Sequence, residues 1–349
     1  MNMKKVFGMV FAVAAVTSFS WVACKSSDKS GQQPVNKDSV AVTIDSSNVP
    51  TVLTDSTRVV LKYRIHPGDV YKFHETVRSE SHGTFNKNPS RSTEESSYHF
   101  SIRMVRTLAD SSIQVMMTYD SINVKVEADG KMRQFRSSDP NQMHDPQYLI
   151  YATLIQSPIL VTIGVGGEIS KVDSLDAIVD KILAGDPQKD SIPPEARIRL
   201  SAQISDGAVK AIVQHVFSHF GTDPVAKKGI WESRFSSTAD VFPTDNVITY
   251  TLQDLSNAGP MRSATFTSDL KVKVLKNVIN DSTAAIRLKG ASFVGTASTQ
   301  VDLVHGITMH KTAHMAVTIS LTAVGHGQYA NNVGDISKTT IRETMLERL

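Results

Sequence analysis

The chain has 349 residues, one cysteine and a formal net charge of +3. A single cysteine excludes an intramolecular disulfide framework. The 37 basic and 34 acidic residues are spread without runs, which excludes the basic footprint of a nucleic-acid-binding protein.

The first residues have the pattern of a secretory signal. Two lysines precede an apolar run that ends at Ala23, and this run is too short and too polar at its end for a membrane span. Cys24 comes next, an arrangement that resembles the bacterial lipobox, in which the cysteine is diacylated and the preceding signal (residues 1–23) is removed. Trp21 departs from the pattern, since leucine is usual three residues before the cysteine.

This resemblance implies a lipid anchor at Cys24, which would hold the protein at a membrane surface without a spanning helix. Lys25 stands where many lipoproteins of the inner membrane have aspartate. The expected location is therefore the bacterial cell envelope, lipid-anchored to the outer membrane and facing either the periplasm or the cell surface. The alternative is an ordinary secreted protein with a cysteine at this position by chance.

Residues 24–57 are expected to form a disordered tether. The segment is rich in Ser, Asp, Lys and Thr and has no aromatic residue, so it cannot bury enough apolar surface to offset chain entropy. Residues 58–349 are long enough to bury roughly three quarters of the surface of the unfolded chain. We therefore expect a β-rich domain over this range.

Alternating apolar and polar residues predict strands in both halves of this domain. The alternation covers 59–65, 98–104 and 113–126, ends at the turn Ala-Asp-Gly-Lys (128–131), and returns over 315–322. Strands with one apolar and one polar face belong to antiparallel sheets that are covered on one side.

The centre of the domain changes to helical spacing. Apolar residues recur every three or four positions over 175–183 and again over 209–220. Gly207 is expected to divide the second helical segment into two pieces. These elements predict an α+β fold, with a curved, half-barrel-like antiparallel sheet and a helical insert at about 173–220 that covers one face.

A faint internal similarity relates two parts of the chain. Residues 98–124 and 268–294 both read as strand, Asp-Ser turn and strand. A duplicated strand pair would explain the similarity, and so would two unrelated hairpins with similar turns.

The space between the sheet and the helices is the candidate for a ligand cavity. It could take a hydrophobic small molecule or a lipid-bearing partner. The residues expected to line it are Phe100, Ile102, Val115, Met117, Ile178, Ile182, Ile212 and Val216. The alternative is a packed core with a protein-binding surface on the loops, because cavity walls and cores use the same residue types.

The histidines predict no metal site. His215 and His219 are one helical turn apart but lack the glutamate of a metalloprotease motif, and we expect them at the rim of the apolar helix face. His305, His310 and His314 have no acidic residue within their stretch. We therefore expect neither a metal nor another cofactor.

Catalytic motifs are also absent from the sequence. The glycines of 164–168 lead into a strand-like segment and not into a helix, so they predict a hairpin turn and not a phosphate loop. There is no Gly-x-Ser-x-Gly elbow and no second cysteine. We expect a protein without enzymatic activity.

Residues 159–182, ILVTIGVGGEISKVDSLDAIVDKI, begin a longer pattern. A strand and a glycine turn lead to a helix, and a strand with Gly229 and Trp231 opens the second β half. Over about 59–300 this resembles a family of uncharacterised bacterial lipoproteins, which has no activity to transfer. The layout is more distantly similar to the half-barrels of lipoprotein carriers and other lipid-binding lipoproteins, an analogy of architecture alone.

Overall fold

The computed structural model describes residues 54, 57–184, 192–257, 262–280, 284–325 and 333–349. Cys24, the signal and almost all of the tether lie outside these residues, and the expectations about them stay predictions. Within the described residues, no helix is both long enough and apolar enough to cross a membrane.

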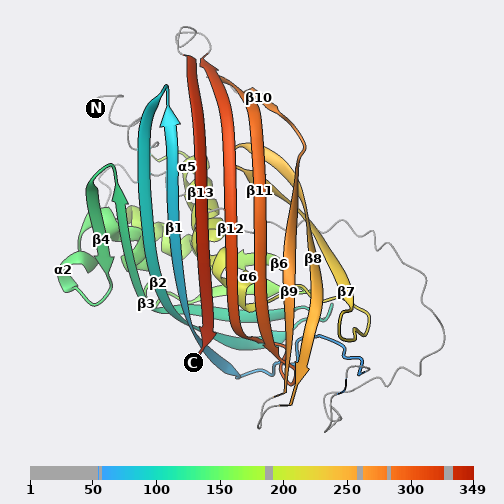
Figure 1. Ribbon diagram of the computed structural model, residues 1–349. Helices are drawn as coiled ribbons and strands as arrows, with labels where there is room; N and C mark the ends of the chain where they lie inside the picture. The colour runs from blue at the N-terminus through green and yellow to red at the C-terminus, as the bar shows by residue number, and fades with distance from the viewer. Residues whose placement is uncertain (1–53, 55–56, 185–191, 258–261, 281–283, 326–332) are drawn as a thin grey trace.

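One open antiparallel sheet of 13 strands makes up most of the described chain (Figure 1). The strands are β1 Val70–Phe85, β2 Asn88–Thr107, β3 Ile113–Ala128, β4 Lys131–Arg136, β5 Ile159–Ile163, β6 Ile169–Asp173, β7 Ile230–Ala239, β8 Phe242–Ser256, β9 Ser263–Val274, β10 Val278–Asn280, β11 Ala284–Asp302, β12 Thr308–Gly325 and β13 Val333–Arg348. Their main order in the sheet is β6-β5-β3-β2-β1-β13-β12-β11-β9-β8-β7, with β4 beside β3 and β10 beside β11. The predicted antiparallel sheet is confirmed. The strand expected over 59–65 is wrong, since in this range only Val59 makes an isolated bridge, to Val225, and the first strand begins at Val70.

The last strand returns to the first. β13 pairs with β1 from Phe73 opposite Arg348 to Phe85 opposite Ile336, and this pairing joins the N-terminal and C-terminal halves into one sheet. The segments with internal similarity lie apart in the sheet, the first in the β2/β3 hairpin and the second in β9 to β11.

The turn between β3 and β4 has the predicted sequence. Asp129 and Gly130 have positive φ angles of 49° and 76°, which match a two-residue hairpin turn whose twist suits antiparallel strands. Asp and Gly are the residue types that adopt this conformation at least cost.

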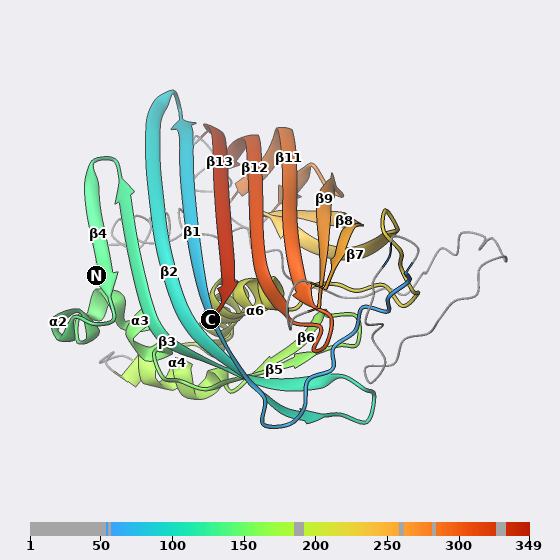
Figure 2. The same cartoon turned by 60° about the horizontal axis from the view of Figure 1, so that its bottom comes forward.

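The helices gather on one side of the sheet, behind it in Figure 1 and around α6 in Figure 2. They are α2 Pro140–Met143, η1 Pro146–Tyr148, α3 Leu149–Leu154, α4 Leu175–Ala184, α5 Pro194–Ile204, η3 Ser205–Lys210 and α6 Ala211–Val216. We call the covered side of the sheet the inner face and the opposite side the outer face.

Gly207 does not divide the second helical segment. The chain stays helical from Pro194 to Val216, and Gly207 lies in η3, a π-helical turn with six residues. A π-turn inserts extra backbone into a helix and leaves carbonyl groups without their usual partners, and such turns often occur at functional positions. The expected break is therefore a local widening of one helix.

Candidate functional site

The eight residues predicted to line a cavity come together between the sheet and the helices. Seven of them are at most 4% exposed and belong to one buried cluster, and Ile182 packs against it half-buried. A space that could hold even a water molecule would leave the side chains around it partly accessible. In this structure these residues contact other side chains and form a core.

Hydrogen bonds from the sheet side hold the helices on this core. Thr308 Oγ1 donates to the Val216 carbonyl at 2.7 Å, and Trp231 Nε1 donates to the His219 carbonyl at 2.9 Å. The Tyr119 hydroxyl donates to the carbonyl of Ala208, inside the π-turn. These side chains donate hydrogen bonds to backbone carbonyls that have no hydrogen-bond partner within the helix.

A buried pair of hydrogen-bonded side chains lies beneath α6. His215 Nδ1 is 3.0 Å from Glu75 Oε2, and the two residues are 7% and 0% exposed. The second oxygen of Glu75 has no hydrogen-bond partner among the described residues. The expectation that His215 and His219 lie at the rim is wrong, since both are buried. Helical spacing could not reveal this, because the partner, Glu75, is 140 residues away in the sequence.

Burial controls the titration of the neighbouring groups. It lowers the pKa of His215, an effect that the nearby Glu75 carboxylate partly opposes. Burial also lowers the pKa of His219 to about 4 and that of Lys311, on β12, to about 8. His215 and His219 are therefore expected to be mainly neutral at pH 7. Since no substrate can reach a pair this deeply buried, we interpret Glu75 and His215 as a structural pair.

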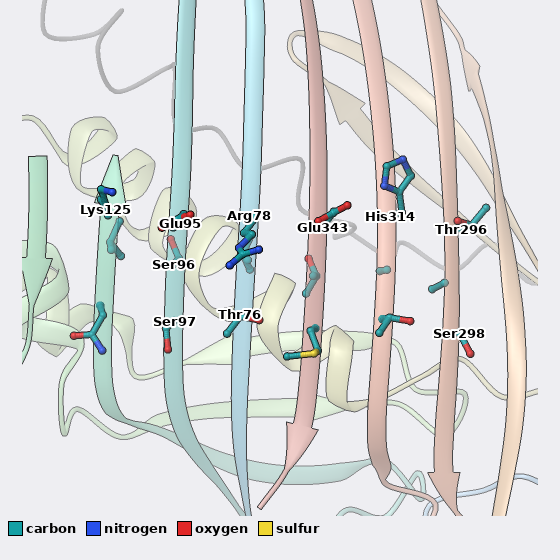
Figure 3. Close-up of a pocket in the computed structure, with 18 of the residues that line it drawn as sticks. Thr76, Arg78, Glu95, Ser96, Ser97, Lys125, Thr296, Ser298, His314 and Glu343 are labelled. Carbon is teal, nitrogen blue, oxygen red and sulfur yellow. The ribbon is translucent and has the colours of Figure 1, made fainter. Parts of the chain in front are cut away.

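A broad groove of about 1120 Å3 crosses the outer face (Figure 3). We call it the outer furrow. Two rows of side chains from the same seven strands line it. In the order β3, β2, β1, β13, β12, β11 and β9, the first row is Lys125, Glu95, Arg78, Glu343, His314, Thr296 and Asp269, and the second is Asn123, Ser97, Thr76, Met345, Thr312, Ser298 and Thr267.

Charges alternate along the first row. Strand register places Arg78 directly opposite Glu95 on one side and Glu343 on the other, and His314 follows Glu343. Figure 3 shows Arg78, Glu343 and His314 side by side on neighbouring strands, in front of the helices. Each pair of opposite charges on neighbouring strands contributes roughly 0.2 to 1 kcal/mol to the stability of a sheet. The same row also presents an ordered charge pattern to solvent.

A second cleft, of about 560 Å3, lies between α4 and α5. Leu175 and Val179 contribute apolar surface, and Ile198 on α5 is 67% exposed. Charged residues also border it, among them Asp206 and Lys210, whose side chains form an ion pair at 2.8 Å.

The three C-terminal histidines do not converge. His305 Nδ1 contacts Asp302 at 2.8 Å, His310 Nδ1 is 3.8 Å from Glu347, and His314 lies opposite Glu343. Each of these histidines therefore has an acidic neighbour. Two of these neighbours, Glu343 and Glu347, belong to β13 and so lie outside the sequence stretch that contains the histidines. Across the described ranges, no three His, Cys, Asp or Glu side chains are grouped closely enough to hold a metal ion.

Comparisons with solved structures give only weak likenesses. Lipovitellin, in a structure of its lipid–protein interactions, aligns with 81% of this chain at 11% identity and a TM-score of 0.40. The alignment spans only 25% of the lipovitellin chain. The translocator domain of the autotransporter NalP from Neisseria meningitidis aligns over 82% of this chain and 90% of its own, at 8% identity and a TM-score of 0.19. OccK5 from Pseudomonas aeruginosa aligns over 80% of this chain and 98% of its own, at 6% identity and a TM-score of 0.20.

Sequence comparison identifies the family. No curated protein matches the chain. The sequence model described as a family of unknown function, DUF6263, matches residues 110–323, which is more than half of the chain and lies largely within the region of the expected resemblance. The protein belongs to this family of unknown function, DUF6263.

Proposed function

We propose that the protein is a lipid-anchored lipoprotein of the bacterial outer membrane that binds a protein partner and catalyses no reaction. In this proposal residues 1–23 are a signal, Cys24 carries the lipid, and residues 24–57 tether the domain to the membrane. The domain, residues 58–349, acts as a half-barrel whose concave side is filled by its helices. This is the interaction-protein alternative that the sequence left open, except that the proposed binding surface lies on the strands of the outer face and not on the loops.

The outer furrow is the observation that carries this proposal. Its lining includes no Phe, Tyr or Trp, so it lacks the large stacking surfaces that sugar rings or bases favour. Its charges are mixed, with Lys125 and Arg78 against Glu95, Glu343 and Asp269, so it lacks the positive field that nucleic acid needs. An extended polypeptide with alternating charges is complementary to such a row, and charge complementarity fixes the register of a partner.

The buried cluster supports the same proposal. Phe100, Val115 and Met117 on the sheet and Val216 on α6 are at most 1% exposed. A ligand between the sheet and the helices would have to displace these contacts. Binding on the outer surface needs no such rearrangement.

A second candidate is the binding of a hydrophobic small molecule by the helices. The cleft between α4 and α5 favours it, because the apolar side chains of Leu175, Val179 and Ile198 border a cleft within the volume range of small-molecule sites. In this candidate the cleft would widen toward the core residues Ile178 and Ile182.

Site-specific photo-crosslinking in cells tests the first candidate. A photoreactive amino acid at Thr76, in the outer furrow, should give a discrete protein adduct. The same amino acid at Thr84 is the matched control, since Thr84 is exposed on the same strand and face but lies outside the furrow. No adduct from Thr76, or equal adducts from both positions, would contradict the proposal.

A charge exchange tests whether the row of charges determines the binding. Arg78→Glu together with Glu343→Arg keeps opposite charges at these two facing positions and reverses their order, and it also places a like charge opposite Glu95. The double variant should lose the Thr76 adduct while its melting temperature stays within a few degrees of wild type. An unchanged adduct would show that the charge order is irrelevant to binding.

A further inference from the structure

A row of potential metal ligands lies beside the outer furrow. His99 on β2, His74 on β1, Glu347 on β13 and His310 on β12 occupy successive positions across four neighbouring strands of the outer face. The row is two residues along each strand from the row that contains Thr76. Its members come from both ends of the sequence, so only the β1–β13 pairing brings them together.

The side chains of this row already lie in pairs. The imidazole rings of His74 and His99 are stacked, with centroids 4.3 Å apart and an angle of 6° between their planes. His310 Nδ1 is 3.8 Å from Glu347 Oε1, and these two side chains are 43% and 48% exposed. His74 Nε2 is 3.0 Å from Ser97 Oγ.

The spacing suits a shared ion. Residues directly opposite each other on antiparallel strands have Cβ atoms about 4.5 to 5.5 Å apart, so two imidazoles can turn their nitrogens toward one point above the sheet. Glu347 is the direct cross-strand partner of His74, and its flexible carboxylate can reach the same point. Two imidazoles and a carboxylate, with positions left open to water, suit zinc or copper.

We propose that His74 and His99 bind a divalent transition-metal ion on the outer face, with Glu347 as the third ligand. Cu2+ should bind more tightly than Zn2+, because affinity at nitrogen and oxygen sites follows the order of the first-row divalent ions. The ion would draw the side chains together, since in the described positions the three do not yet converge on one point.

Electron paramagnetic resonance with Cu2+ tests the proposal on the full-length chain, purified without a histidine tag. One equivalent of Cu2+ should give a type 2 spectrum with hyperfine coupling to two imidazole nitrogens. Coupling to fewer than two nitrogens would overturn the proposal. This readout uses the wild-type protein and does not depend on the folding of any variant.

Calorimetric titration of Cu2+ then assigns the ligands. His74→Ala and His99→Ala should each weaken binding by roughly 10- to 100-fold, the range that even outer-shell partners of a metal site cost. Glu347→Gln should also weaken it. His314→Ala is the matched control, because His314 is a histidine of the same face opposite a glutamate, Glu343, and should bind Cu2+ like wild type. Equal affinities for His74→Ala and His314→Ala would overturn the assignment.

Discussion

Replacing His215 with alanine should lower the free energy of unfolding by about 3 kcal/mol, the upper end of the cost of leaving a buried polar group without its hydrogen-bond partner. The change would leave the Glu75 carboxylate fully buried without its imidazole partner, 3.0 Å away in the native protein. Keeping a carboxylate buried after it has lost its hydrogen-bond partner costs more than the contact itself contributed. Urea denaturation at pH 7 measures the difference.

The double variant Glu75→Gln, His215→Ala is the matched control for this prediction. It removes the same imidazole but leaves a neutral amide, which costs less to bury than a carboxylate. It should therefore be more stable than His215→Ala alone. If His215→Ala costs less than about 1 kcal/mol, the typical net worth of one hydrogen bond, then the pair does not hold α6 on the sheet.

Cys24→Ser should completely abolish the incorporation of labelled fatty acid and stop signal removal at this point. In a lipobox the fatty acids are attached through the thiol of the cysteine, and the hydroxyl of serine does not accept this modification. Cys24 is the only cysteine, so no second thiol could account for the label in wild type. Radiolabelled palmitate in cells, followed by mass analysis of the N-terminus, measures both effects. Unchanged labelling and unchanged membrane association in the variant would contradict the lipid anchor.

Local patterns in the sequence were sufficient for much of the sheet and for the main helices. Alternation predicted β2, β3 and β12 because one face of each strand is buried and the other is not. Helical spacing predicted α4, which buries one apolar stripe. It also predicted α6, but all six residues of α6 are buried, including the polar Gln214 and His215.

The short helices α2 and η1 were missed although a local signal was present. Each begins with an Asp-Pro pair, in which the aspartate side chain accepts a hydrogen bond from the helix and the proline occupies the first turn. Asp139-Pro140 and Asp145-Pro146 could therefore have been recognised as helix starts from the sequence alone.

The sites depend on register, which no local pattern encodes. Glu75 meets His215, and His74 meets Glu347, only because β1 pairs with β13 and α6 crosses beneath the sheet. The outer furrow likewise exists only when seven strands align their outward residues. The periodicity of a single sequence identifies which residues share a face of a strand. The register between strands that are distant in the sequence depends on how all the strands and helices pack together.

The central claim is that the space between the sheet and the helices is a packed core and that binding takes place on the outer surface. Native mass spectrometry of residues 58–349, secreted by a bacterial host and purified without detergent, tests it most directly. The account predicts the mass of the polypeptide with no retained hydrophobic molecule. A stable adduct with the mass of a lipid, lost on gentle activation, would contradict it and favour a ligand cavity lined by Phe100, Val115 and Ile212.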